Sequence, residues 1–466
     1  MTLQNSIESN KKPTTQIPLW RQLQGAASIL QAVRSGESGT SALNRMDDSL
    51  RPGVQALSFH VWRWLGTAEI IKSYLVKRTP SSQADALLCV ALAILGGESE
   101  SLHYETFTLV DQAVEAAKRN PNTSPSSSFI NACLRRFLRE KEALTSKALT
   151  HPVGQWNHPQ WWIKRLKIDH PNTWQDILRL NNVHAPLSVR VNTKKTTVDA
   201  YLADFNAIHN AANGEPNKVI KNEVEQAGKF GVSFAKAIPV HEILGFSDGT
   251  VSVQDAAAQL AAPLLLNGMN LNVRSRVLDA CAAPGGKTAH LLEIADCDVT
   301  ALDIDSTRCD LIHQTLNRIG LTAKVIAADA AKPDTWFDPQ KDVLFDAILL
   351  DAPCTASGIV RRHPDIRWLR RETDVAQLAE IQRQLLTTLW PLVKPGGRLL
   401  YCTCSVFKAE GQDQVTLFTS NNKNARLLAS PGHLLPKSSA KTGVVADNSL
   451  INHDGFFYAL FEKQTT

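Results

Sequence analysis

Apolar positions recur with the spacing of amphipathic helices through the first 146 residues. They stand three and four residues apart in the segments VWRWLGTAEIIKSYLVKR, ADALLCVALAILGG, ETFTLVDQAVEAAKR and SFINACLRRFLREKEAL. This spacing places apolar side chains on one face of a helix, and the alternation typical of strands is absent. The pattern predicts an all-helical domain over residues 18–146, preceded by a polar, disordered tail at residues 1–17.

The pattern changes twice after the helical region. Residues 147–250 are mixed, with a short helical stretch at HPQWWIKRL and a strand at LSVRVNT, and predict a small α+β linker domain. From residue 251, short apolar strands such as RVLDA, DVTALDID, FDAILLDAPC and GGRLLYCTCSV alternate with helical segments. Such alternation predicts a parallel sheet covered by helices on both faces. The chain is therefore expected to be a multidomain protein whose residues 251–466 form an α/β domain.

Composition narrows the class of protein. A chain of 466 residues with 43% hydrophobic and 20% charged residues is typical of a globular protein with two or three domains. The longest apolar run, Ala86 to Leu95, is too short to span a bilayer, and the polar N-terminus does not resemble a signal peptide. The eight scattered cysteines, with no CxxC pair, predict free thiols, a cytoplasmic location and no metal site.

Positive charge is concentrated between residues 151 and 195. The net charge of this segment equals the +5 of the whole chain, and four tryptophans lie among the charges. Cations and flat rings suit a polyanion such as RNA, but a solvated basic face with tryptophans packed inward fits equally well. Both interpretations stay open, and the candidate RNA-binding residues of this segment are Lys164, Arg165 and Arg190.

The stretch VLDACAAPGGKT combines an apolar strand, a Gly/Pro loop and the start of a helix. In parallel sheets the ligand lies beyond the carboxyl ends of the strands, and amides at a helix start can hold an anion. A Walker A loop needs glycine where this chain has Cys281, and the dinucleotide pattern GxGxxG is absent. The loop therefore suits a nucleoside with a smaller anionic group. Its candidate ligand-binding residues are Cys281, Ala282, Ala283, Pro284, Gly285, Gly286 and Lys287.

Acidic residues end the next three predicted strands. Asp303 is placed to bind two ribose hydroxyls, and Asp329 to accept a hydrogen bond from an adenine amine. Asp351 ends the fourth strand. An adenosine ligand with an amino-acid carboxylate meets these requirements, so S-adenosyl-L-methionine fits this set better than NAD.

Three motifs taken together, LDACAAPGGKT, LLDAPCTASGIVRRHPDIRW and YCTCSV, resemble the Sun (Nop/Sun) family of RNA cytosine-5 methyltransferases. The resemblance is strongest to the bacterial members that act on 16S ribosomal RNA. Upstream, LSVRVN and GTVSVQDAAAQ are similar to the family's pre-catalytic segment, and INACLRRFLREKEAL to its NusB-like RNA-binding domain. Only the tail, residues near 209–228 and residues 421–450 are unmatched. The resemblance implies a Rossmann-like class I domain dependent on S-adenosyl-L-methionine.

The same resemblance assigns roles to two cysteines. The family's nucleophile is the cysteine of a Thr-Cys-Ser unit, here Cys404, and the cysteine of a Pro-Cys unit, here Cys354, assists product release. DNA cytosine-5 methyltransferases attack with the Pro-Cys cysteine, so Cys354 stays a rival nucleophile. Cys402 is a thiol that the family does not require. We expect it on the same side of its strand as Cys404, as a small apolar filler.

Cytosine C5 is a poor nucleophile until a thiolate adds to C6 and converts the ring to an enamine. The nucleophile therefore needs an electropositive, partly exposed setting. Asp351 is expected to contact the cofactor and the N3/N4 edge of cytosine. Arg361, Arg362 and His363 follow the Pro-Cys unit and are expected to supply positive potential or bind RNA phosphates.

The predicted partner is 16S ribosomal RNA, because the resemblance points to that substrate. A target cytosine must be unstacked before a thiol can approach it, which favours naked RNA or an early assembly intermediate. We expect a monomer. Two other functions stay open: a catalytically inactive NusB-like RNA-binding or ribosome assembly factor, and a methyltransferase that acts on an exocyclic amine.

Overall fold

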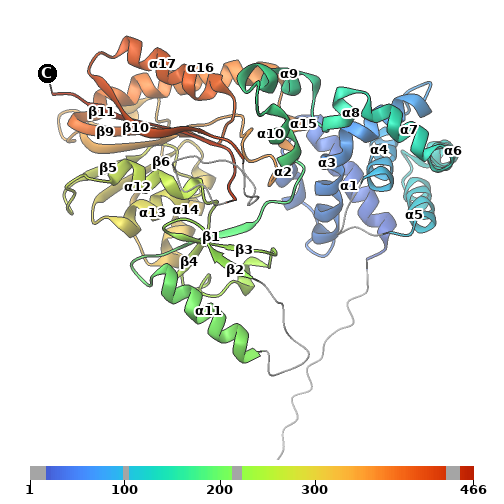
Figure 1. Cartoon of the computed structure of the whole chain (residues 1–466), viewed down its shortest axis with the longest axis horizontal. Coiled ribbons are helices and arrows are strands. Elements are labelled where there is room, and N and C mark those ends of the chain that lie inside the picture. The colour runs from blue at the N-terminus through green and yellow to red at the C-terminus, as the bar shows by residue number, and fades with distance from the viewer. Residues whose placement is uncertain (1–16, 98–103, 213–222, 437–451, 466) are drawn as a thin grey trace, which may run out of the picture. The chain divides into compact units, whose positions relative to one another are not determined.

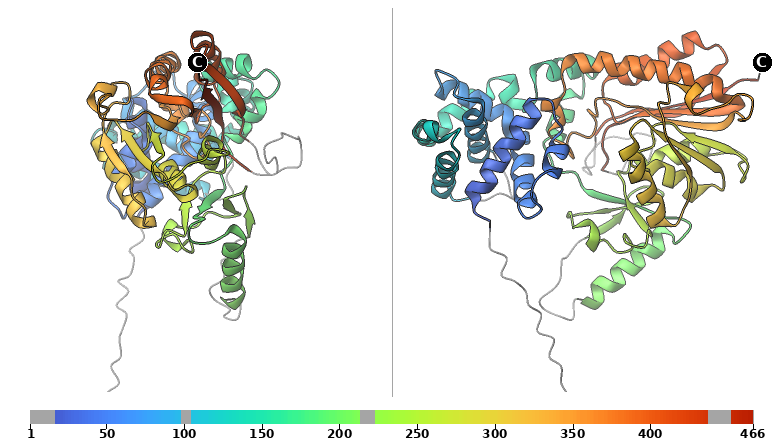
Figure 2. Two further views of the ribbon diagram at one scale, coloured as in Figure 1. Left: turned by 90° about the vertical axis from the view of Figure 1, so that its left-hand side faces the viewer. Right: turned by 180° about the vertical axis from the view of Figure 1, so that it is seen from behind.

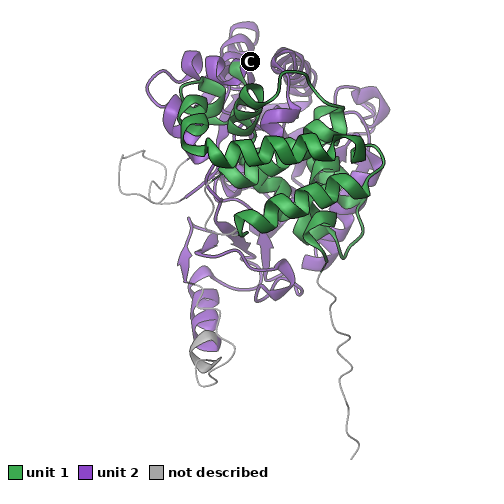
Figure 3. Ribbon diagram, turned by 90° about the vertical axis from the view of Figure 1, so that its right-hand side faces the viewer, with its two compact units in different colours: residues 1–160 green, residues 161–466 purple. Residues whose placement is uncertain are grey.

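The computed structural model describes residues 17–97, 104–212, 223–436 and 452–465. The chain divides into two compact units, residues 1–160 and residues 161–466 (Figure 3). The predicted tail, apart from Ile17, lies outside the described residues. The finer division of the chain into three folded domains stays a prediction.

The first unit is helical, as its apolar spacing predicts. Helix α4 is buried on nearly every side, because its residues 84–95 are almost all apolar and the other helices surround it. Its only buried charge, Asp85, is paired with Arg34 and Lys72 at 2.9 and 2.7 Å. The helices are α1 Leu19–Arg34, α2 Gly39–Asn44, α3 Arg51–Leu75, α4 Ser82–Gly96, α5 Thr106–Arg119, α6 Ser127–Arg139, α7 Lys141–Leu149 and α8 Pro152–Trp156, with the short 3-10 turn η1 Ser124–Ser126.

The second unit begins with two helices and a small antiparallel sheet. Helices α9 Gln160–Asp169 and α10 Trp174–Leu180 precede a four-stranded sheet of order β2-β3-β1-β4. Its core forms where alternating apolar residues of the strands meet one face of α11. The elements are β1 Leu187–Val191, α11 Val198–Ala212, β2 Val224–Gln226, β3 Gly231–Phe234 and β4 Val251–Val253, with the short turn η2 Val240–Glu242.

A seven-stranded sheet of order β10-β11-β9-β8-β5-β6-β7 forms the rest of the unit (Figure 1). The strands from β7 to β9 are parallel, and β11 runs antiparallel to both β9 and β10. This is the Rossmann-like sheet expected for a methyltransferase. The strands are β5 Arg276–Asp279, β6 Asp298–Asp303, β7 Lys324–Ala327, β8 Phe345–Asp351, β9 Val393–Thr403, β10 Ala425–Leu434 and β11 Phe456–Lys463.

Helices cover both faces of this sheet, as Figures 1 and 2 show. Helices α12, α13 and α14 pack on one face and α16 and α17 on the other, each with its own apolar cluster. Strong burial on both faces explains why the strands read as continuous apolar runs. The helices are α12 Ala261–Leu266, α13 Gly286–Ile294, α14 Ser306–Ile319, α15 Ile366–Leu369, α16 Glu372–Leu389 and α17 Gln412–Asn421, with short turns η3 Ala258–Leu260, η4 Pro333–Thr335, η5 Trp390–Leu392 and η6 Lys408–Glu410.

The strand order reverses direction at β5. From β5 the chain moves outward to β6 and β7, then crosses back to place β8 and β9 on the other side of β5. In open α/β sheets such a reversal leaves a crevice at the carboxyl ends of the strands, where ligands bind. This rule places the expected ligand crevice between the ends of β5 and β8. No described helix is long and apolar enough to cross a membrane.

A buried ion pair joins the small sheet to helix α13. Arg190 of β1 binds both carboxylate oxygens of Glu293 on α13, at 2.8 and 2.7 Å, and neither side chain is more than 1% exposed. Its Nη1 also donates to the backbone oxygen of Gly286 at 2.9 Å. A fork of donors meeting a carboxylate in this way is both strong and directional. Arg190 therefore ties β1 to both ends of α13.

Replacing Arg190 with methionine should lower the stability of the chain by about 3–5 kcal/mol, because it leaves Glu293 as an uncompensated buried charge. The double variant Arg190→Met/Glu293→Leu should recover much of this loss, since both charges are then removed. Thermal unfolding of the full chain checks both. Arg179→Met, which breaks an exposed pair with Asp176, is the control and should change little. Equal losses in the single and double variants would contradict this account.

Candidate active site

The loop between β5 and α13 is held by both strands next to β5. Ala280 N donates to Leu349 O of β8 at 2.9 Å, and Ala282 N donates to Leu302 O of β6 at 2.8 Å. Gly285 ends the loop with a φ of 94°, in the left-handed region that favours glycine. The loop therefore has a fixed path across the crevice before the first turn of α13.

The predicted cofactor residues come together at this edge of the sheet. Asp303 accepts a hydrogen bond from Ala283 N at 3.2 Å and faces Arg308 at 3.4 Å. Asp329 and Asp351 lie at the ends of their strands with side chains 30% and 29% exposed. The acids at the ends of three consecutive strands thus line one crevice, as expected from the sequence.

Asp279, the last residue of β5, supplies an unsatisfied acceptor beside the loop. Its Oδ2 accepts a hydrogen bond from Thr288 at 2.7 Å, while its buried Oδ1 has no partner among the described residues. Burial raises the pKa of Asp279 to about 7, and the nearby charge of Asp351 contributes in the same direction. A buried acceptor without a donor fits a cationic ligand group, such as the ammonium of S-adenosyl-L-methionine.

Lys287, in the first turn of α13, forms an ion pair with Asp351 at 2.6 Å. Burial lowers the pKa of Lys287, but Asp351, Cys402 and Cys404 together raise it above its ordinary value. The lysine therefore carries its charge at neutral pH. Cys404 is among the groups that interact electrostatically with Lys287, so this lysine places a positive charge near the candidate nucleophile.

The two motif cysteines meet at the ends of β8 and β9. Their sulfur atoms are 3.4 Å apart, Cys354 is 9% exposed and Cys404 is partly exposed. The hydrogen bond to Cys404 and burial both raise the pKa of the Cys354 thiol. Cys354 therefore retains its proton and can donate to the sulfur of Cys404.

Cys402 is more than an apolar filler. It is fully buried opposite Asp351 in the β8–β9 register, and its sulfur donates to Asp351 Oδ1 at 3.4 Å. Burial raises the pKa of the Cys402 thiol, so it stays protonated and acts as a donor. Cys402 and Cys404 contact the same apolar cluster, which confirms that they point to the same side of the strand.

Two of the three residues expected to supply positive potential or bind RNA phosphates are engaged in ion pairs. Arg361 is 1% exposed and bound to Asp454. Arg362 is paired with Asp454 and with Asp255 at 2.8 Å. Burial lowers the pKa of His363, which is half-buried. Direct contact of Arg361 with a phosphate does not fit this buried pairing, and the Arg362 guanidinium is already engaged.

The basic segment, residues 151–195, has features of both interpretations, a surface for RNA and a solvated face with tryptophans packed inward. Trp162 is fully buried and packs on Phe407, with ring centroids 5.0 Å apart, so this tryptophan points inward. Lys164 is exposed, and Arg165 is partly exposed beside Asp169 at 3.5 Å. Arg190 lies in the buried pair described above, which does not fit the RNA contact predicted for it. Lys164 and Arg165 stay candidates.

The segment also supports the loop that carries Cys404. His170 hydrogen-bonds Val406 O at 2.6 Å, and Asp169 accepts from Lys408 N at 3.1 Å. These contacts could not be predicted from the sequence, because more than 230 residues separate the partners. The end of α9 therefore holds the loop after β9 through these two hydrogen bonds.

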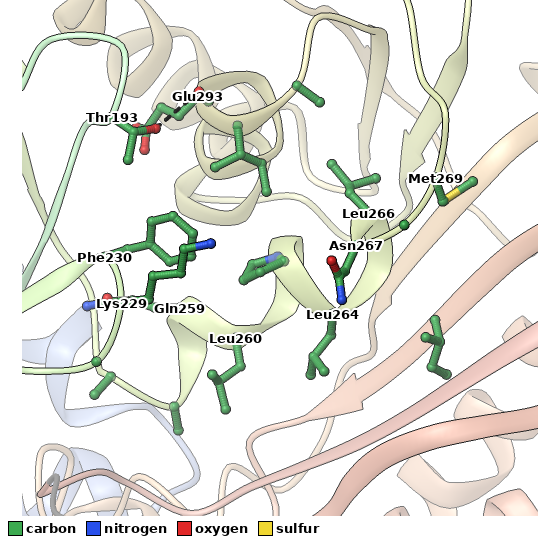
Figure 4. Close-up of a pocket in the computed structure, with 18 of the residues that line it drawn as sticks. Thr193, Lys229, Phe230, Gln259, Leu260, Leu264, Leu266, Asn267, Met269 and Glu293 are labelled. Atoms are coloured by element: carbon green, nitrogen blue, oxygen red, sulfur yellow. Dashed lines mark hydrogen bonds between the residues drawn. The ribbon is translucent and has the colours of Figure 1, made fainter. Parts of the chain in front are cut away.

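A hollow of about 1100 Å³ lies elsewhere in this unit, between α12 and the turn at Lys229 and Phe230 (Figure 4). Apolar side chains such as Leu264 and Met269 line much of it. None of the predicted site residues lines this hollow. The candidate active site is therefore assigned to the strand ends, from the chemistry of the side chains there, and not to this hollow. In the described part of the chain, no cluster of three or more His, Cys, Asp or Glu side chains could hold a metal ion.

Comparison with known proteins identifies the family. Residues 266–462 match the family model described as 16S rRNA methyltransferase RsmB/F, and residues 158–219 match the RsmF/B-like ferredoxin-like domain. The Ribosomal RNA small subunit methyltransferase B of Vibrio cholerae is 36% identical over 94% of this chain and 96% of its own length. The chain belongs to the RsmB/F family of 16S rRNA methyltransferases. The resemblance to the Sun family is thereby confirmed, and this RsmB/F protein is an S-adenosyl-L-methionine-dependent methyltransferase.

Solved structures agree with this assignment. The crystal structure of PH0851 covers 95% of this RsmB/F chain and 99% of its own chain, with a TM-score of 0.70 and 25% identity. NSun6 from Pyrococcus horikoshii with SFG covers 66% of this chain and 99% of its own, with a TM-score of 0.53 and 18% identity. The second similarity is one of fold.

Asp279→Asn should change stability in a pH-dependent way. The folded-state pKa of about 7 lies above the ordinary 3.8, so the protonated acid stabilises the fold at low pH. That contribution is lost as the pH rises through about 7. The variant should therefore melt at a higher temperature than the wild type at pH 8, and the difference should shrink at pH 4. Its affinity for S-adenosyl-L-methionine should fall; a melting difference independent of pH would contradict the assignment.

Cys402→Ala should retain most of its methyl-transfer activity. The variant removes one sulfur hydrogen bond to Asp351, worth about 1 kcal/mol, while Lys287 still binds the other carboxylate oxygen. A reduction in kcat of no more than about tenfold is expected, measured by transfer of labelled methyl groups. Complete loss of activity would show that the thiol has a further role.

Proposed function

We propose that this protein transfers a methyl group from S-adenosyl-L-methionine to C5 of one cytosine in 16S ribosomal RNA, through a covalent bond between Cys404 and C6. The observation that carries the proposal is the pair of sulfur atoms 3.4 Å apart, one buried and one partly exposed, beside Lys287. Methylation of an exocyclic amine would need no such pair. The relatives' names, which give the small-subunit RNA as their substrate, support the choice of RNA.

Bound S-adenosyl-L-methionine supplies an electrophilic methyl group. Residues 281–287 and the acids Asp303 and Asp329 are the proposed contacts of the cofactor. Asp279 Oδ1 and the amides that open α13 suit the ammonium and carboxylate of its methionine end. These assignments leave the sulfur of Cys404 and the carboxylate of Asp351 available to contact the target cytosine.

In the proposed reaction, Cys404 attacks C6 as a thiolate, stabilised by the positive charge of Lys287. Asp351, fixed by Lys287 and Cys402, accepts a hydrogen bond from the N4 amine of the ring and so orients C6 toward Cys404. The enamine that results makes C5 nucleophilic. After methyl transfer the C5 proton leaves to a base, the C6–S bond breaks and Cys404 departs as a thiolate. Cys354 is assigned to this release because its sulfur lies next to that of Cys404.

The remaining parts of the chain are proposed to supply affinity. Residues 18–146 are proposed to be a NusB-like RNA-binding domain, and residues 147–250 a linker domain whose exposed cations contact phosphates. The ferredoxin-like match over residues 158–219 supports a separate module within this linker. The substrate is proposed to be naked RNA or an early assembly intermediate, bound by a monomer.

Methylation of unmodified 16S RNA, compared with methylation of assembled small subunits and followed by bisulfite sequencing, tests the reaction, the modified nucleotide and the assembly state. A protein that binds S-adenosyl-L-methionine and RNA but transfers no methyl group would be an inactive binding factor.

Single cysteine substitutions should separate the two thiols. Cys404→Ala should abolish both methyl transfer and the covalent RNA adduct, because no nucleophile remains. Cys354→Ala should accumulate adduct that survives a denaturing gel, because release is blocked. Cys402→Ala, two residues from Cys404 on the same strand, is the matched control and should behave as the wild type in the adduct assay. If Cys404→Ala still forms adduct and Cys354→Ala does not, the two roles are reversed.

A further inference from the structure

Glu410 is a fully buried acid that the reaction above does not use. It ends the short turn η6, six residues after Cys404. A carboxylate is costly to bury unless donors satisfy it, so its partners should reveal its purpose.

The partners of Glu410 are the residues that directly follow the two cysteines. Thr355, next to Cys354, donates its backbone N to Oε1 at 2.8 Å and its hydroxyl to Oε2. Ser405, next to Cys404, donates its hydroxyl to Oε2 at 2.6 Å. One carboxylate thus binds the loop after β8 and the loop after β9 at equivalent positions.

Two further residues, Gln382 and Tyr401, hold Glu410 in place. Gln382 of α16 donates to Glu410 Oε1 at 3.3 Å and to Pro353 O at 2.8 Å. Tyr401 donates to Glu410 O at 2.7 Å. Burial leaves the pKa of Glu410 raised, although the hydrogen bonds from Ser405 and Thr355 offset part of the shift. All of its side-chain partners can donate, which suits the ionised form.

We propose that Glu410 is a positioning residue that sets the separation of the two active-site thiols. The inference rests on the proposed function and deepens it. Loops at strand ends are mobile unless they are tied down, and reacting groups displaced by about 1 Å can lose about 10²-fold in rate. Both cysteines sit on such loops, and Glu410 joins them without touching either sulfur, the cofactor loop or Asp351.

The test compares Glu410→Ala and Glu410→Gln with Gln414→Ala. Gln414 is a buried polar residue in the first turn of α17, and it hydrogen-bonds Ala379 and Ala409 but neither of the residues that directly follow the two cysteines. Glu410→Ala should lower kcat by about 10²-fold while the Kd for S-adenosyl-L-methionine stays within twofold of the wild type. Glu410→Gln keeps the shape of the side chain and one acceptor oxygen, so its kcat should lie between those of the wild type and Glu410→Ala. Gln414→Ala should keep the wild-type kcat.

A second readout reports thiol geometry without RNA or cofactor. Diamide takes two electrons and two protons from a pair of thiols and leaves a disulfide. In the wild type, Cys354 and Cys404 should cross-link rapidly, because their sulfur atoms already lie 3.4 Å apart. Glu410→Ala should slow this cross-link, followed by non-reducing peptide mass spectrometry, and Gln414→Ala should not.

Unchanged kcat and cross-linking in Glu410→Ala would overturn the inference. So would equal losses of kcat, cofactor affinity and melting temperature in Glu410→Ala and Gln414→Ala, which would show a general structural role. If Glu410→Ala does not fold, Thr355→Val replaces it, since it deletes one hydroxyl contact; it must reproduce the slower cross-link and reduced kcat. If the wild type transfers no methyl to cytosine C5, the proposed function fails, while the cross-linking comparison still decides the positioning role.

Discussion

The ion pair between Lys287 and Asp351 is the interaction on which the rest of the site depends. It joins the first turn of α13, where the cofactor loop ends, to the carboxyl end of β8, next to the Pro-Cys loop. Both partners lie largely out of solvent, so each charge needs the other. The pair spans the crevice where the strand order reverses, and it also places a positive charge near Cys404. The proposed cofactor loop and the proposed nucleophile therefore share one ion pair.

This shared element also explains the distribution of acids at the sheet edge. Asp279, Asp303 and Asp351 end neighbouring strands. Burial raises the pKa of Asp279, and the charges of Asp351 and Asp303 raise it further. Three carboxylates in one crevice repel one another unless cations or donors intervene. Lys287 and Arg308 offset two of them. Asp279, the third, keeps a buried Oδ1 without a donor among the described residues, which the ammonium group of a ligand would complement.

Contiguous motifs allowed the fold and much of the site to be predicted. Residues 281–287 and the acids Asp303, Asp329 and Asp351 follow strands directly, and parallel pairing brings strand ends together. The antiparallel strands β10 and β11 are absent from the predicted strands, although the apolar run FFYALFEK was a signal for one of them. Pairings between distant residues could not be predicted, because nothing in a single chain marks the partner. Arg361 reads as an exposed cation until Asp454, 93 residues later, is seen to bind it.

The same limit applies to the cysteines, whose difference arises from their surroundings. Cys354, Cys402 and Cys404 are chemically identical, and the spacing of Cys402 and Cys404 makes them equivalent on their strand. In the fold, Cys402 is enclosed by β8 and β11, opposite Asp351 and Tyr458, and it donates to a carboxylate. Cys404 follows the last residue of β9, where the chain leaves the sheet and the side chain reaches the crevice. A shift of two residues along one strand thus separates a thiol that orients Asp351 from one that is free to meet a substrate.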